Sequence, residues 1–178
     1  RIYQYSMKVS MIFEIVLFVV LIAFQTTIFS RISVFGVATP ILYIYFLIKL
    51  PMGRNVFYVI TSGFLMGLII DIFLNTPGMN AAATTIIAAL RKPLLNVFFS
   101  RDDYEEFVPS IYSSTKSFIR FVIVITIMHQ TLLFFIESFT FFNLSYTIVR
   151  IFASSALTLV LIFALDGLMY RKSSGIQA

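Results

Sequence analysis

Long apolar stretches separated by short polar segments dominate the chain, and this pattern predicts membrane-spanning helices. About 20 apolar residues cross a bilayer as a helix, and backbone in hydrocarbon must satisfy its own hydrogen bonds, which favours helices. We therefore predict an all-α, polytopic membrane protein with one transmembrane domain over residues 1–178. Its six helices are predicted at Met11–Phe29, Ile32–Leu50, Val56–Leu74, Thr76–Leu90, Phe118–Ile136 and Thr147–Tyr170.

Two of the six stretches depart from a uniform helical pattern. Gly36 and Pro40 interrupt the second stretch, so its uniformly helical part is expected over Pro40–Leu50 only. The fourth stretch is short, and we expect Arg91–Pro93 to end it, with Leu94–Phe99 lying along the membrane interface. If the fourth stretch turned back without crossing, the later segments would change sides.

The composition supports a membrane protein. Of the 178 residues, 60% are hydrophobic and 12% are charged, and the mean hydropathy is +0.97. Soluble domains have about 45–50% apolar and roughly 25% charged residues. The chain contains no cysteine, which excludes disulfides and thiolate metal sites.

The positive charges distinguish between the two topologies. The net charge is +5, but the cations lie between apolar stretches and form no basic face, so we expect topology signals and no nucleic-acid binding. With six spans and a cytoplasmic N-terminus, 11 of 13 cations lie inside and only Arg31 and Arg150 lie outside. If the fourth stretch turned back, 5 would lie inside and 8 outside. We therefore predict six spans, both termini in the cytoplasm and a cytoplasmic Ser100–Lys116 loop.

The beginning of the chain does not resemble a cleavable signal peptide. The first apolar stretch, of about 19 residues, is long for a signal peptide, and no small-residue cleavage site follows it. We therefore expect this stretch to be the first membrane span.

Gly63, Gly67 and Asp71 recur every four residues, so on a helix they share one face. The two glycines form a small-xxx-small pair, which lets two membrane helices approach closely. The simpler interpretation is that the glycines pack against a neighbouring helix of the same chain. The alternative is a docking face for a membrane helix of another protein.

Asp71 stands near the outer end of the third predicted helix, where an ionisable group needs a partner. The turn Thr76–Gly78, with Pro77 and Gly78, brings the start of the fourth helix close, and its free N–H groups could bind the carboxylate. Arg31 and Arg150 are the alternative partners. Three roles remain open for Asp71: a structural clamp, a contact with another protein, or ion or proton coupling.

The other polar residues within the spans favour structural roles. His129 and Gln130 are predicted to form interhelical hydrogen bonds, since no further ligand is spaced for a metal. Glu14 and Asp166 are expected to snorkel or to pair with Lys or Arg at the same interface, with a proton relay as the alternative. The chain has no nucleotide-binding fingerprint, nucleophile elbow or paired catalytic acids, so we expect no enzyme, no catalytic residue and no cofactor.

One group of motifs resembles a known family. The pattern GxxxGLxxD at Gly63–Asp71, the Pro77-Gly78 turn, the small residues Ala81–Ala83, and the Arg-Lys-Pro and SRDDYEE segments that follow are similar to the rod shape-determining protein MreD family. The resemblance is most specific over about residues 60–106, and elsewhere it rests on the number and spacing of the spans.

The resemblance implies a subunit of the bacterial elongation (rod) complex in the inner membrane, without enzymatic activity. Such a subunit would bind the bitopic scaffold MreC and help to link actin-like MreB filaments to the peptidoglycan polymerase and transpeptidase, and so maintain cell shape. The family is also similar in fold to the substrate-binding membrane subunits of vitamin transporters. The alternative hypothesis is therefore a subunit that binds or transports a small molecule, and a third is an ion or proton channel.

Overall fold

The computed structural model describes residues 2–34, 36–99, 108–111, 114–138 and 144–174. These residues contain no β-strand, only an isolated bridge between Val34 and Ala38. The chain is therefore all-α, as predicted. The helices are α1 (Ile2–Thr27), the 3₁₀ helix η1 (Phe29–Arg31), α2 (Ile44–Lys49), α3 (Val56–Leu74), α4 (Met79–Phe98), α5 (Thr115–Glu137) and α6 (Leu144–Ser174).

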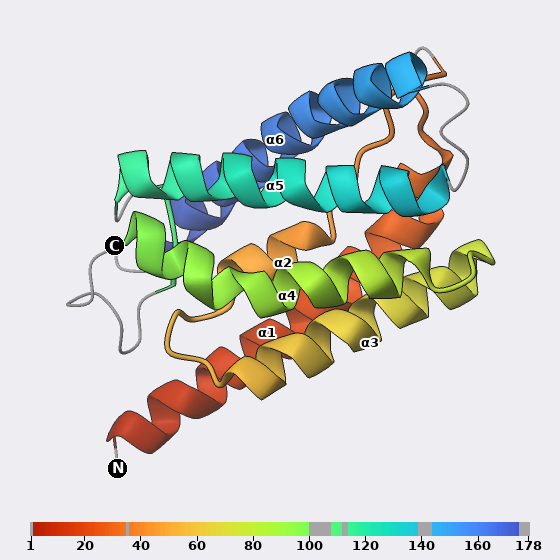
Figure 1. Cartoon of the computed structure of the whole chain (residues 1–178). Helices are drawn as coiled ribbons and strands as arrows, with labels where there is room; N and C mark the ends of the chain where they lie inside the picture. Colours follow the sequence, from red (N-terminus) through yellow and green to blue (C-terminus); the bar gives the residue numbers. More distant parts are fainter. Residues whose placement is uncertain (1, 35, 100–107, 112–113, 139–143, 175–178) are drawn as a thin grey trace.

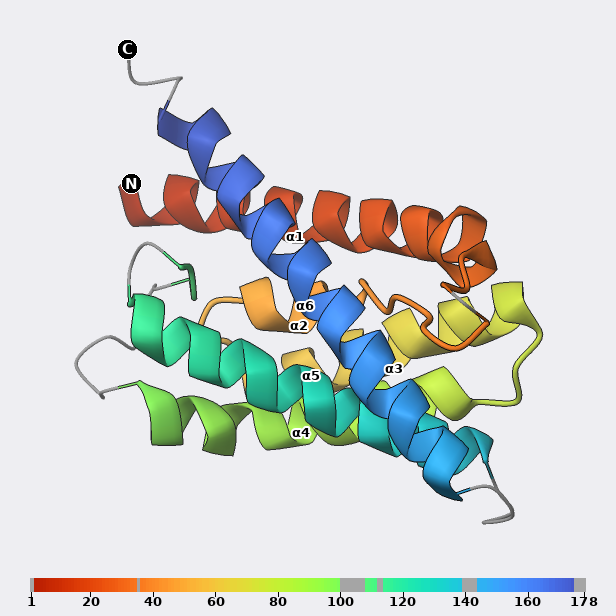
Figure 2. The ribbon, with the colours of Figure 1, turned by 90° about the horizontal axis from the view of Figure 1, so that it is seen from above.

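The short helix α2 lies in the middle of the molecule. The longer helices surround it in both views (Figures 1 and 2), and its residues Ile44–Ile48 are buried. Around it α3 packs on α4, α4 on α5 and α5 on α6, while α1 packs on α3. The core therefore forms around a segment that is itself too short to span a membrane as a helix.

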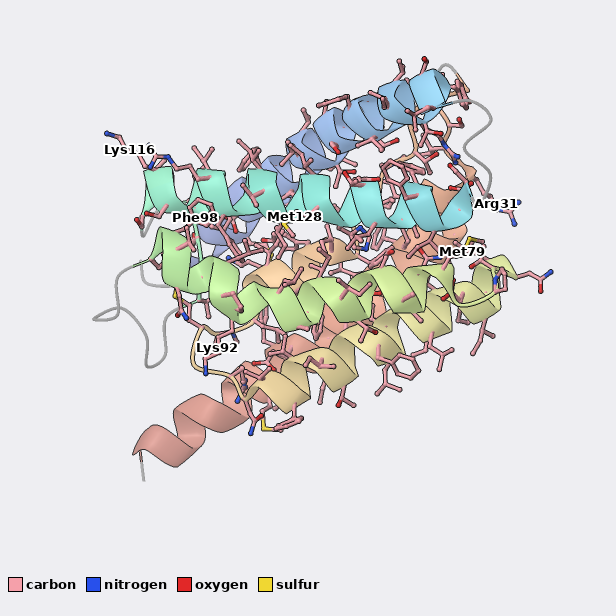
Figure 3. All side chains as sticks on the ribbon, in the orientation of Figure 1. Arg31, Met79, Lys92, Phe98, Lys116 and Met128 are labelled. Carbon is pink, nitrogen blue, oxygen red and sulfur yellow. The ribbon has the colours of Figure 1, made fainter. Side chains whose placement is uncertain are left out.

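Four helices are long and apolar enough to cross a membrane. Among the described residues they lie at Met11–Arg31, Val56–Leu74, Thr115–Glu137 and Leu144–Met169. The start of α1 and the end of α6 lie at the same end of the molecule (Figure 1). Lys92 and Lys116 lie at this end too, and Arg31 lies at the other (Figure 3).

The third predicted helix, Val56–Leu74, coincides with α3. The second, Ile32–Leu50, is helical only over Ile44–Lys49, so its expected helical part, Pro40–Leu50, begins four residues too early. Gly36 adopts a left-handed conformation with φ of +70°, and Pro40 cannot donate a backbone hydrogen bond. Residues 36–43 instead form an irregular segment, which is exposed at Gly36 and buried from Pro40 to Tyr43.

The fourth predicted helix, Thr76–Leu90, also needs correction. Helix α4 begins at Met79 and continues to Phe98 with Pro93 inside it, so Leu94–Phe98 belongs to the helix. Arg91 does not end the helix, and its buried side chain donates hydrogen bonds to the carbonyls of Leu47 and Leu50 at the end of α2. A cation is favourable there because the C-terminal end of a helix carries partial negative charge.

Candidate functional site

Asp71 binds the beginning of α4. Its Oδ1 accepts hydrogen bonds from the Thr76 hydroxyl (2.5 Å), the Asn80 backbone N–H (3.1 Å) and the Asn80 side-chain amide (2.8 Å). Its Oδ2 accepts one from the backbone N–H of Ala81 (2.8 Å). The carboxylate is only 3% exposed. Four donors, all from the turn and the first residues of α4, therefore satisfy it.

The turn between α3 and α4 makes this geometry possible. Asn75 and Gly78 both have left-handed backbone conformations, with φ of 54° and 75°. The backbone N–H groups of Asn75 and Thr76 bond back to the carbonyl of Asp71, which ends α3. The chain reverses within a few residues, and the free N–H groups of α4 point at the carboxylate. A negative charge is stabilised at this position because a helix N-terminus carries partial positive charge.

The two candidate arginine partners lie elsewhere. Arg150 forms an ion pair with Glu137 (3.0 Å) and places its guanidinium over the ring of Phe134. Arg31 is exposed, and within the described part of the chain it takes part in no ion pair. The partner of the Asp71 carboxylate is therefore the N-terminus of α4 and not an arginine.

Gly67 and Gly63 lie where α3 and α4 approach most closely. A Cβ atom on Gly67 would meet the Thr84 hydroxyl and would lie 2.6 Å from both the Cα of Ala81 and the carbonyl oxygen of Asn80. On Gly63 it would lie 3.0 Å from the Cβ of Ala88. The glycine pair therefore packs within the chain, as the simpler interpretation predicted, and the contact is tightest at Gly67.

A chain of buried hydrogen bonds extends from Asp71 to α5. Asn80, whose amide donates to Asp71, accepts a hydrogen bond from the Tyr43 hydroxyl (2.8 Å). The Tyr43 oxygen lies 3.2 Å from Nε2 of His129. Because Tyr43 donates to Asn80, Nε2 of His129 is the donor in the second contact. The predicted interhelical hydrogen bond is confirmed for Gln130, which donates to Thr158 of α6, whereas His129 contacts Tyr43 of the irregular segment, which thereby joins the α3–α4 turn to α5.

Side chains of α1 and α6 hold the irregular segment in place. Gln25 accepts a hydrogen bond from the backbone of Leu42 (2.8 Å) and donates one to the carbonyl of Pro40 (3.1 Å). Thr158 accepts from the backbone of Ile41 and also from the side chain of Gln130, each over about 3 Å. Non-helical backbone is tolerated at membrane depth only where protein groups satisfy it.

The sequence analysis missed Gln25, Thr158 and Ser154, which accepts a hydrogen bond from the backbone N–H of Thr39 (3.0 Å). A polar side chain that stands alone in an apolar helix is the signal that could have found them, because such a group needs a partner inside the protein. Pro40 indicates where the partner lies, since proline interrupts regular hydrogen bonding.

Two ion pairs join the helices at the opposite end of the molecule from the Asp71 turn. Glu14 on α1 binds Arg54 (2.5 Å) and also accepts from the Tyr58 hydroxyl. Asp166 on α6 binds Lys49 (2.8 Å), at the end of α2. The expectation that Glu14 and Asp166 pair with nearby cations is confirmed.

Asp166 also fixes the start of the segment that leads into α5. Its Oδ2 accepts hydrogen bonds from the Ser110 hydroxyl and the Ile111 backbone, while Lys49 donates to the carbonyl of Pro109. Most of the predicted Ser100–Lys116 loop, including its four acids, lies outside the described residues.

The site defined by these contacts is a helix-to-helix clamp inside an all-α membrane protein. Among the described residues no three His, Cys, Asp or Glu side chains gather as a metal site would require. No protein-family model, no curated protein and no solved structure matches the chain.

Proposed function

We propose that this protein is a non-enzymatic, multi-pass subunit of the bacterial elongation (rod) complex in the inner membrane. It binds the scaffold MreC and helps to link MreB filaments to the peptidoglycan polymerase and transpeptidase. The observation that carries the proposal is the α3–α4 hairpin, because it is built from the residues that resemble the MreD family. Gly63, Gly67 and Asp71, together with the Pro77-Gly78 turn, join α3 and α4 into one rigid hairpin.

A rigid hairpin suits a protein whose task is to hold partners in position. The polar groups of the hairpin form hydrogen bonds within it. The outward side of α3 presents large apolar side chains such as Phe57, Ile72 and Phe73. Helix α1 likewise exposes apolar side chains between Met11 and Phe24, as Ile12 and Val19 illustrate. Apolar faces of this kind suit contact with lipid or with a membrane helix such as that of the scaffold.

We also propose that the chain crosses the membrane six times, with both termini in the cytoplasm. Helix α4 is 20 residues long, which is enough to span about 30 Å, and its polar side chains Asn80, Thr84 and Arg91 are buried against the protein. The irregular segment and α2 together provide the second pass. With Arg91 and Lys92 in the cytoplasmic half of α4, this arrangement places 11 of the 13 cations towards the cytoplasm and only Arg31 and Arg150 towards the outside.

Single-cysteine labelling tests this topology, because the natural chain has no cysteine. Cysteines at Ser6, Ser113 and Ser173 should resist a membrane-impermeant thiol reagent in intact cells and should react after the membrane is opened. A cysteine at Ser33, which is exposed near Arg31, should react without opening. Labelling of Ser113→Cys in intact cells would contradict the six-pass topology.

The proposed membership of the rod complex is tested by co-purification. Tagged protein that is gently extracted from native membranes should carry the scaffold with it. Recovery of an ATPase pair in place of the scaffold would support the alternative, a transporter subunit.

A further inference from the structure

A cavity of about 330 Å³ opens at the end of the molecule that holds the Asp71 turn. Residues of α1, the irregular segment, the α3–α4 turn, α5 and α6 line it, and Met79 marks its position beside the start of α4 (Figure 3). Sites for small molecules measure about 300–1,000 Å³. The cavity therefore has room for a ligand at the small end of this range.

The walls of the cavity are of two kinds. Leu133, Phe134 and Met79 provide an apolar side. Tyr43 and Asn80 provide a polar side, and because they are hydrogen-bonded to each other over 2.8 Å they are fixed in position. Such a cavity is formed before any ligand enters, and it suits a molecule with an apolar body and a polar end.

The polar end of the ligand is specified by two charged side chains, Arg150 and Glu137. Both line the cavity, and their side chains are 26% and 39% exposed. Arg150 donates one hydrogen bond to one oxygen of Glu137 and is held over the ring of Phe134, 4.4 Å from its centre. No other hydrogen bond of either group is found among the residues that the structure describes. A guanidinium has five donors and a carboxylate two oxygens, so both retain unused bonding capacity.

The charges around the cavity disfavour a ligand with a single charge. Arg150 and Glu137 cancel, and Asp71 lies directly behind Thr76 and Asn80, which line the wall. A free anion would meet a net negative surrounding, and a free cation would lie next to Arg150. A ligand that carries both charges close together complements both side chains.

We propose that this cavity binds a small zwitterion of the α-amino acid class with an apolar side chain, such as leucine or phenylalanine. Its carboxylate binds the free part of the Arg150 guanidinium, a pairing that suits the planar fork of arginine. Its ammonium binds Glu137, and its side chain packs against Leu133, Phe134 and Met79. The zwitterionic headgroup of phosphatidylethanolamine presents related chemistry. The inference does not depend on the proposed function.

The test is a binding measurement on the full chain in nanodiscs made of phosphatidylglycerol, which has no zwitterionic headgroup. Leucine and phenylalanine are titrated by calorimetry beside 3-methylbutylamine and 4-methylpentanoic acid, which each carry one of the two charges of leucine. We expect leucine to bind at least about tenfold more tightly than either analogue, because each analogue loses a charge-assisted hydrogen bond. The absence of leucine and phenylalanine binding at millimolar concentration, or equal binding of the amine, would overturn the proposal.

Variants locate the binding. Leu133→Trp and Met79→Trp fill the cavity from two different walls and should abolish leucine binding. Arg150→Gln should weaken leucine binding about tenfold, whereas it should strengthen the weak binding of the amine, because the neighbouring cation is removed and Glu137 is freed. Ile86→Trp, on an exposed face of α4, is the matched control and should bind leucine like the parent, and thermal melting confirms that each variant is folded.

Two outcomes would contradict the assignment even if leucine bound. Undiminished binding by folded Leu133→Trp and Met79→Trp would place the ligand outside the cavity. If nanodiscs containing phosphatidylethanolamine no longer bound leucine, the lipid headgroup would be the occupant, and the free amino acid would be rejected as the ligand.

Discussion

Gly67→Ala should destabilise the protein, whereas Gly167→Ala should not. Both glycines lie inside long helices, so both substitutions remove the same flexibility from the unfolded chain and gain roughly 0.5–1 kcal/mol of helix stability. A Cβ on Gly67 meets backbone atoms of α4 at 2.6 Å, whereas one on Gly167 has no atom within 4 Å. Backbone cannot rotate away as a side chain can, so α3 and α4 must move apart, at a cost of about 1–3 kcal/mol.

Equilibrium unfolding in mixed detergent micelles measures the difference. The expected order of stability is Gly167→Ala, then Gly63→Ala, then Gly67→Ala, because the Cβ on Gly63 meets only side-chain and carbonyl atoms at 3.0 Å or more. Gly67→Leu should prevent accumulation in the membrane, whereas Leu68→Ala should be tolerated better. Equal stability of Gly67→Ala and Gly167→Ala would show that the α3–α4 contact is looser than the structure has it.

Asp71→Leu should have the second large effect. It leaves four donors, including the backbone N–H groups of Asn80 and Ala81, without their acceptor. An unsatisfied buried donor costs about 1–3 kcal/mol, so we expect a strong loss of membrane abundance. Asp71→Asn should be partly tolerated, because its amide oxygen still meets the three donors now bound to Oδ1, and only Ala81 loses its acceptor.

Membrane abundance, scaffold binding and cell shape should be measured together for these variants. Ile86→Ala is the control, since Ile86 is exposed on α4 and lies outside the α3 face proposed for partner contact. The clamp predicts that abundance, scaffold binding and shape decline together, mildly for Asn and strongly for Leu. Normal abundance and scaffold binding with lost function in both variants would instead indicate proton coupling at Asp71 and would reject the clamp.

The third helix and its turn were predictable because their signals are local. An uninterrupted apolar stretch predicts α3, and the spacing of Gly63, Gly67 and Asp71 places all three on one face. Where the chain reverses, Pro77 restricts the backbone and Gly78 allows the left-handed conformation that the turn needs. The donors to Asp71 then follow from chain connectivity, because the next helix must begin within a few residues.

The irregular segment could not be predicted in the same way. Residues 41–48 are as apolar as a membrane helix, and the helical part was therefore predicted to begin at Pro40, four residues before α2 begins. Its non-helical part is held by Gln25, Ser154 and Thr158, which are distant in sequence and donate or accept hydrogen bonds only after the chain has folded. A prediction based on one stretch at a time does not include these partners.

The end of α4 was misplaced for a related reason. A basic residue followed by lysine and proline is typical of the end of a membrane span, yet Arg91 binds the carbonyls at the end of α2 and the helix continues. Whether an arginine meets lipid headgroups or another helix depends on the packing of α2 against α4, which the local pattern does not contain.

Co-purification from native membranes tests the central claim most directly. The tagged parent protein and Ile86→Ala should each recover the scaffold MreC, identified by mass spectrometry, and Asp71→Leu should recover less of it per molecule of tagged protein. A control tag on an unrelated multi-pass protein should recover none. Recovery of an ATPase pair, or of no cell-wall scaffold from cells that contain one, would contradict the proposed membership of the rod complex.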